Sequence, residues 1–147
     1  MPGTSDDTVT PDTAAALLRR QGLRVTRPRA LILDLLITSG QHFEVAAIVE
    51  RIRTGPTTIS VQAVYNILTM LTHAGLVRRT EPAGRPSLFE ARTGDNHHHL
   101  ICRDCGSIAD LDCAATVIPC LAPSNDHGYH IDEAEVCWYG RCATCQS

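Results

Sequence analysis

Four of the seven cysteines fall into two Cys-x-x-Cys pairs, a spacing that suits the binding of one metal ion. The first pair is Cys102 and Cys105, followed directly by Gly106, and the second is Cys142 and Cys145 near the end of the sequence. Each pair places two thiolates close together on a tight turn, and two pairs complete a tetrahedral four-thiolate Zn²⁺ site. Structural zinc contributes roughly 10–16 kcal/mol in small peptides, enough to decide whether a small domain folds. The alternatives are two unrelated thiol pairs or one redox pair.

Three consecutive histidines precede the first cysteine pair. On a β-strand, His97 and His99 would lie on one face and His98 on the other. Two imidazoles on one face, with carboxylates nearby, suit Fe²⁺, Mn²⁺, Zn²⁺ or Ni²⁺. Glu90 and Asp110 are close enough in the sequence to join them. We therefore predict a second metal centre beside the four cysteines, against the alternative of a solvated polar strand.

Three further cysteines lie outside the two pairs: Cys113, Cys120 and Cys137. As small apolar residues they could simply be buried. The functional alternative is that Cys113 and Cys120 form a disulfide or act as redox-sensing thiols, which depends on their exposure and pKa. The single tryptophan, Trp138, is expected in the core or at a dimer interface.

The two halves of the sequence carry opposite charge. Residues 14–89 contain ten arginines against four acidic residues, a net charge of +6. Residues 90–147 contain three arginines against nine acidic residues, a net charge of −6. This asymmetry indicates that the positive N-terminal half binds a polyanion. The negative C-terminal half, which carries the three consecutive histidines and all seven cysteines, has a different function.

Length and composition limit the alternatives. A chain of 147 residues, 44% hydrophobic and 4% aromatic, has room for one ordinary domain or two small ones. The sequence contains no apolar run of about 18 residues, so no membrane span is predicted. The polar, acidic N-terminus lacks the features of a signal peptide, so we expect a cytoplasmic protein. In that compartment cysteines favour metal or redox chemistry over a disulfide framework.

The N-terminal half has the pattern of a winged helix-turn-helix. Capping residues and apolar periodicity predict four helices, begun by Asp12 or Thr13, by Thr26, near Val45 and by Ser60. Leu31, Leu35 and Leu36 are expected on the buried face of the second helix, and Val45, Ile48, Val49 and Ile52 on that of the third. Two strands at 76–80 and 87–92 then form a hairpin. The fourth helix, 61–75, would enter the DNA major groove, with the hairpin beside the backbone.

The C-terminal half is expected to be a small sheet. Strands are predicted at 97–102, 107–113 and 129–140, the last at an edge. Residues 114–128 could hold a short helix, limited by Pro119 and Pro123.

Six segments together form a specific pattern, although each alone would be weak: 22–29, 60–68, 74–77, 88–90, 96–106 and the terminal Cys-x-x-Cys. In these segments the sequence resembles the ferric uptake regulator (Fur) family, over nearly the whole chain after the first dozen residues. The DNHHH, DCA, PCL and DEAE patterns are similar to those of the actinobacterial FurA and CatR subgroup of peroxide- and iron-responsive repressors.

The resemblance implies an α+β fold: an N-terminal winged helix-turn-helix domain and a small C-terminal α/β dimerisation domain with a four-cysteine zinc site. Residues 1–12 would be a disordered tail, 13–92 the DNA-binding domain, 93–96 a hinge and 97–147 the dimerisation and metal-binding domain. It also implies a regulatory metal shared by both domains, with these ligands: His42, Glu90, His97, His99 and Asp110. A metal that favours one arrangement of the domains shifts the population toward it.

The implied function is that of a metal-dependent homodimeric repressor of palindromic A/T-rich operators, not an enzyme, without a small-molecule substrate. The regulatory metal would be Fe²⁺ or Mn²⁺, with peroxide or metal loss relieving repression of catalase, catalase-peroxidase or iron genes. A zinc or nickel uptake regulator of the same family is the alternative, with Zn²⁺ or Ni²⁺ sensed. Outside this class, the alternatives are a thiol-disulfide redox protein and a metal-storage protein.

Residues expected to contact DNA lie on the N-terminal helices and the fourth helix: Arg19, Arg24, Arg29, Ser60, Gln62, Tyr65 and Asn66. Arg24 would reach a narrow minor groove, and Arg29 would hold a phosphate. Many relatives carry Arg where this chain has Asn66. A third metal site found in many members is not expected, because Ala134 stands where a histidine ligand would be needed.

Overall fold

A computed structural model describes residues 13–55, 58–91, 97–112 and 122–147. The predicted tail, the predicted hinge, Cys113, Cys120 and most of the predicted short helix lie outside these residues. Among the described residues, no helix is both long enough and apolar enough to cross a membrane.

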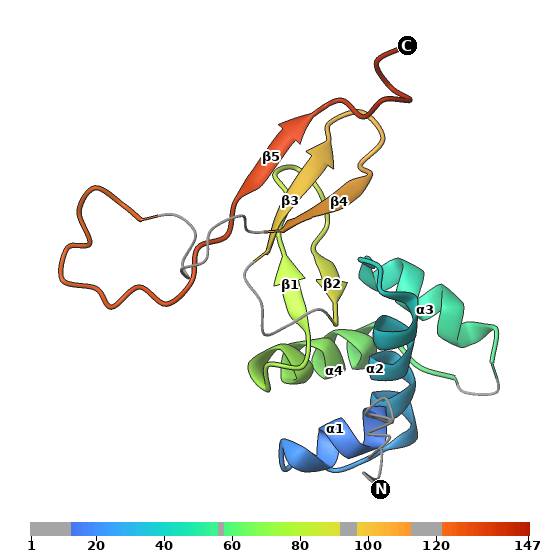
Figure 1. The fold of residues 1–147 in the computed structure, drawn as a ribbon. Helices are drawn as coiled ribbons and strands as arrows, with labels where there is room; N and C mark the ends of the chain where they lie inside the picture. The colour runs from blue at the N-terminus through green and yellow to red at the C-terminus, as the bar shows by residue number, and fades with distance from the viewer. Residues whose placement is uncertain (1–12, 56–57, 92–96, 113–121) are drawn as a thin grey trace, which may run out of the picture.

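Four helices make up the N-terminal part, as predicted (Figure 1): α1 (Ala14–Arg20), α2 (Arg27–Ser39), α3 (Val45–Arg53) and α4 (Val61–His73). Thr13, Thr26 and Ser60 precede α1, α2 and α4, and each side chain accepts a hydrogen bond from the backbone N–H three residues on. Such caps satisfy donors that the first helical turn leaves unpaired.

Apolar side chains from all four helices form one core. The predicted stripe of α3 is confirmed, because Val45, Ile48, Val49 and Ile52 are all buried. On α2 the expectation is confirmed for Leu36, which is buried, and wrong for Leu31, which is 38% exposed; Ile32 and Leu33 are buried as well. Helix α2 contacts α1, α3 and α4, so its buried face is broader and rotated relative to the predicted stripe.

The predicted hairpin follows α4 and consists of β1 (Arg78–Thr80) and β2 (Leu88–Glu90), paired antiparallel. Phe43, in the loop between α2 and α3, forms two backbone hydrogen bonds of 2.9 Å with Phe89 on β2. This bridge fastens the α2–α3 loop to the hairpin and fixes His42 next to Glu90. The hairpin lies between the helices and the second sheet (Figure 1).

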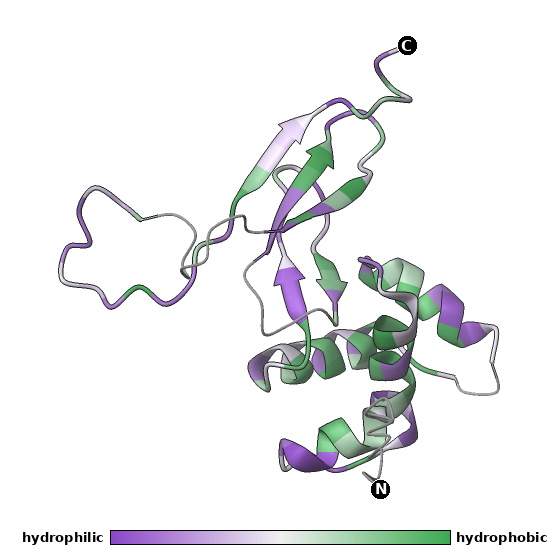
Figure 2. Cartoon of the chain, in the orientation of Figure 1, coloured by the Kyte–Doolittle hydropathy of each residue, from purple (hydrophilic) through white to green (hydrophobic). Residues whose placement is uncertain are grey.

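The second sheet has the order β4-β3-β5, with β3 (His97–Cys102) antiparallel to β4 (Ile108–Asp112) and parallel to β5 (Cys137–Gly140). Strand β3 is hydrophilic where it begins and hydrophobic further along (Figure 2). Strand β5 is an edge strand, as predicted.

The expected strand over 129–140 is wrong in length, since only 137–140 pairs. Because β3 begins at His97 and its residue His99 already pairs with Cys137, few residues of β3 remain to pair with residues before 137. The preceding residues, Glu133 and Glu135, instead contact Arg78 and Thr80 of the hairpin.

Candidate metal centres and DNA-binding surface

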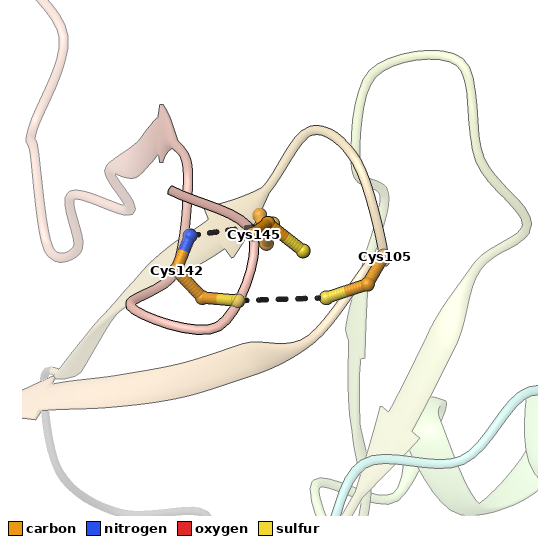
Figure 3. A group of neighbouring side chains, drawn as sticks. Cys105, Cys142 and Cys145 are labelled. Carbon is orange, nitrogen blue, oxygen red and sulfur yellow. Dashed lines mark hydrogen bonds between the residues drawn. The ribbon is translucent and has the colours of Figure 1, made fainter. Parts of the chain in front are cut away.

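The four paired cysteines meet at one end of the second sheet. Cys102 ends β3, Cys105 lies in the turn after it, and Cys142 and Cys145 lie in the turn after β5. The parallel pairing of β3 with β5 brings the two turns together, and the four sulfur atoms all lie within 4.8 Å of one another. The sulfurs of Cys105 and Cys142 point toward each other at 3.8 Å, with Cys145 beside them (Figure 3).

The electrostatics of this cluster fit a bound divalent cation. Backbone N–H groups of Cys105 and Cys142 lower the pKa of the Cys102 thiol to about 6. In contrast, hydrogen bonding to the sulfurs of Cys142 and Cys105 raises the pKa of Cys145 to about 12. The first thiolate therefore forms readily, whereas a set of four so close together needs a cation to replace the protons.

Gly106 closes the first turn and has a positive φ of 76°, as expected for a residue without a Cβ. A Cβ at this position would also lie 2.2 Å from the guanidinium of Arg85, in the turn of the β1–β2 hairpin. Arg85 donates hydrogen bonds to the carbonyl oxygens of Arg103 and Asp104 at 3.0 and 3.4 Å. The hairpin turn is therefore packed directly on the first cysteine turn.

We predict that Cys142→Ser abolishes stoichiometric zinc and lowers the melting temperature, because a tetrahedral site loses one of four ligands. Zinc content and thermal unfolding of the purified protein measure both effects. Cys137→Ser is the matched control, since burial and the Glu135 charge raise the pKa of this thiol outside the cluster. Full zinc retention in Cys142→Ser would contradict the four-cysteine site.

Five predicted ligands converge in a second cluster, at the junction between the helices, the hairpin and the second sheet. Nε2 of His42 lies 3.0 Å from Glu90 Oε2 and 3.2 Å from Asp110 Oδ1. Nε2 of His97 and of His99 lie 2.8 and 3.2 Å from Glu90 Oε1. One atom from each residue lies within 4.8 Å of the others. The structure thus brings together all five residues from the α2–α3 loop, β2, β3 and β4.

The donors of this cluster are arranged for a cation. Burial raises the pKa of the Glu90 carboxyl, but the neighbouring imidazoles of His42, His99 and His97 lower it overall to well below its usual range. Nε2 of His42 is buried and has no aligned hydrogen bond within the described part of the chain, although carboxylate oxygens lie nearby. The imidazole nitrogens and carboxylate oxygens converge without each forming a hydrogen bond with a single partner, and such an arrangement suits one shared ion. Nitrogen and oxygen donors without sulfur fit Fe²⁺, Mn²⁺, Zn²⁺ or Ni²⁺.

His98 faces the other side of β3, as the strand alternation predicts. Its Nδ1 accepts a hydrogen bond of 3.2 Å from the Val136 N–H, and its ring packs edge-on against Trp138. One neighbour of the cluster was not predicted: Glu135 Oε1 lies 3.3 Å from Nδ1 of His99. No sequence spacing signals this contact, because it depends on the parallel pairing of β3 with β5.

The residues predicted to contact DNA all lie on the helical part. On α4, Tyr65 is 44% exposed, and the exposed Gln62 amide donates a hydrogen bond of 3.0 Å to Asn66. The guanidinium of Arg29 donates to the carbonyl oxygen of Arg24 at 2.9 Å, and Arg19 is exposed at the end of α1. These positions leave the polar face of α4 accessible.

A winged helix joined to a small sheet with two clusters of metal ligands defines a metal-responsive DNA-binding regulator. The chain matches the model of the ferric uptake regulator family over residues 20–139 and belongs to that family. Members of this family are transcriptional regulators that bind DNA and act as dimers, and they are not enzymes.

The similar proteins agree with this assignment. The transcriptional regulator FurA of Mycobacterium tuberculosis is 46% identical over 131 residues, covering 89% of this chain and 88% of that relative. Ferric uptake regulation protein 2 of Mycolicibacterium fortuitum is 47% identical over 131 residues, covering 88% and 90%. The structure of the Vibrio cholerae ferric uptake regulator is 26% identical with a TM-score of 0.68, covering 87% of this chain and 98% of that one.

Proposed function

We propose that this chain is a homodimeric cytoplasmic repressor that binds palindromic A/T-rich operators when a regulatory metal, Fe²⁺ or Mn²⁺, occupies the second cluster. The observation that carries the proposal is the convergence of His42, from the helical part, with Glu90 on the hairpin and three residues of the second sheet. The four-cysteine cluster would hold structural Zn²⁺ and keep the sheet folded. Residues 13–92 and 97–147 would be the DNA-binding and the dimerisation domain, joined by a hinge at 93–96.

The arrangement gives a physical route from metal to DNA. A bound cation would offset the charge of Glu90 and Asp110 while binding the imidazole of His42. Since His42 belongs to the helical part and Asp110 to the sheet, occupancy favours the arrangement in which both reach the same ion. Such an ion shifts the domain equilibrium only by its difference in affinity for the two arrangements. In a dimer, that arrangement sets the spacing of the two α4 helices.

The peroxide response is proposed by likeness to the actinobacterial subgroup. Bound ferrous iron would supply the one-electron chemistry that turns peroxide into an oxidant. The imidazole rings of His42, His97 and His99 would lie beside such an oxidant, and modification of any of them would remove a metal ligand. Oxidation of Cys113 and Cys120 is the second route. Target genes would be catalase, catalase-peroxidase or iron genes, and a zinc or nickel response is the alternative within the family.

The test is footprinting of the zinc-loaded dimer with Fe²⁺, Mn²⁺, Zn²⁺ or Ni²⁺, each with and without peroxide. We expect Fe²⁺ or Mn²⁺ to raise operator affinity and peroxide to reverse the effect with Fe²⁺. His42→Ala should remove most of the metal effect, because the helical part loses its ligand. His130→Ala, an exposed histidine distant in the sequence from the cluster residues, serves as control. Binding that ignores both metal and peroxide would contradict the proposal.

The dimer interface is proposed on the outer face of the second sheet. Leu100 and Trp138 are register partners on β3 and β5, and they are 43% and 45% exposed. Leu111, 37% exposed on β4, pairs with His98 and lies on the same face. Adjacent exposed apolar residues of this size favour burial against a second copy in a family that acts as dimers.

We predict that Leu100→Asp shifts the protein from dimer to monomer, because a carboxylate would be buried without a partner in the interface. Sedimentation velocity at micromolar protein measures the change. Tyr129→Asp, at a residue 77% exposed before β5, is the matched control and should leave the dimer intact. A Leu100→Asp variant that remains fully dimeric would place the interface elsewhere.

For DNA we propose that Ser60, Gln62, Tyr65 and Asn66 read the major groove from α4. Arg19, Arg24 and Arg29 would contact the backbone or the minor groove. Because these arginines lie on the net positive part of the chain, they supply the sequence-independent share of the affinity.

We expect Arg29→Ala to weaken binding uniformly across operator variants and to lower the salt slope of log K by about one. Titrations at several salt concentrations measure this, with Arg141→Ala beside the cysteine cluster as control. In contrast, Gln62→Ala or Tyr65→Ala should change sequence preference. Unchanged affinity and slope in Arg29→Ala would mean that this residue does not face the DNA backbone.

A further inference from the structure

Glu135 lies against a ligand ring of the second cluster, on the side away from the other ligands. The His99 ring is fully buried, with Nε2 toward Glu90 and Asp110 and Nδ1 on the opposite edge. Glu135 Oε1 is 3.3 Å from that Nδ1, at hydrogen-bonding distance but off the ideal direction. A carboxylate therefore faces the one ring nitrogen of His99 that does not face the metal ligands.

The same carboxylate oxygen also contacts the hairpin. The hydroxyl of Thr80, a 1% exposed residue on β1, donates a hydrogen bond of 3.2 Å to Glu135 Oε1. Two residues earlier, Glu133 forms an ion pair with Arg78, which also donates to the carbonyl oxygen of His97. Residues 133–135 thus lie along β1, and Glu135 joins this strand to the His99 ring through one oxygen atom.

The chemistry of imidazole gives this contact a role. A neutral histidine that binds a metal through Nε2 carries its proton on Nδ1. An acceptor at Nδ1 fixes this tautomer and the ring orientation and makes Nε2 a better ligand. Loss of such an outer partner costs about 10–100-fold in metal affinity in other proteins.

We propose that Glu135 is a positioning residue of the regulatory centre, which orients the His99 ring for metal and connects it, through Thr80, to strand β1 of the hairpin. The inference rests on the proposed function, because it assumes a metal held by His99 Nε2. The consequence is that metal binding and hairpin docking are coupled. The orientation of the His99 ring that binds the metal is also the orientation in which Glu135 keeps its hydrogen bond with Thr80. Metal binding and hairpin docking then favour each other reciprocally.

A different reading of the same atoms is a further metal site. His99 Nδ1, a Glu135 oxygen and the Cys137 sulfur lie within 4.8 Å of one another. To serve both sites, the His99 imidazole would have to lose both ring protons and bind one ion at each nitrogen. A neutral imidazole keeps one ring proton, so only one of its nitrogens is free to bind a metal, and the contacts favour positioning over ligation.

The test uses zinc-loaded protein titrated with Co²⁺, whose absorption reports the nitrogen and oxygen ligands of the regulatory centre. We expect Glu135→Ala to weaken Co²⁺ binding about 10–100-fold and Glu135→Gln to restore part of the affinity. In the absence of Co²⁺, the ¹⁵N spectrum of the His99 ring should show Nδ1–H in the wild type and mixed tautomers in Glu135→Ala. Zinc content should not change.

Two further variants separate positioning from general structure. Glu133→Ala removes the ion pair with Arg78 but touches no ring nitrogen, so Co²⁺ affinity and the His99 tautomer should stay as in the wild type. Thr80→Val removes the hydroxyl at similar volume and should reduce the effect of metal on operator affinity.

Three results would overturn the inference. Wild-type Co²⁺ affinity together with an unchanged His99 tautomer in Glu135→Ala would show that the carboxylate does not position the ring. A second Co²⁺ ion that is lost in both Glu135→Ala and Cys137→Ser would make Glu135 a ligand. No Co²⁺ binding by the wild type outside the cysteine cluster would overturn the proposed function itself, and is thereby distinguishable from failure of the positioning role alone.

Discussion

Two backbone hydrogen bonds between Phe43 and Phe89 hold the second cluster together, because they fasten a helix–helix loop to the hairpin. The loop has no regular structure that would otherwise fix it. With the bridge in place, His42 lies beside Glu90, and both reach the histidines of β3. Phe43 and Phe89 are also buried in the helical core, so the geometry of the adjacent ligands His42 and Glu90 depends on the packing of that core.

The two clusters share strand β3 of the second sheet but differ in what they can do. Four sulfurs on two turns form a closed set, which suits a metal that stays in place. Three imidazoles and two carboxylates come from the helical part, the hairpin and the sheet, so their geometry changes whenever these parts move. Arg85 packs the hairpin turn on the cysteine turn, so this end of the hairpin is held against the second sheet. In the proposed function, stability and response therefore depend on different donor atoms.

Local features of the sequence predicted local structure well. The caps Thr13, Thr26 and Ser60, the α3 stripe and the alternation of His97, His98 and His99 depend on residues close in sequence. The length of β5 and the contact of Glu135 with His99 depend on a parallel pairing across 38 residues, which no spacing reveals. Membership of His42 in the cluster came only from family resemblance, because a lone loop histidine carries no signal of its own.

The edge-on packing of Trp138 against His98 has a practical consequence. The chain contains a single tryptophan, so all of its tryptophan emission arises from this position. The indole ring is 5.6 Å from His98, which lies between the two ligand histidines of β3, and it is half exposed on the outer face of the sheet. Its fluorescence therefore reports on whatever covers the outer face of the sheet, where His98 and Trp138 lie together. The protein carries a native optical reporter on this face.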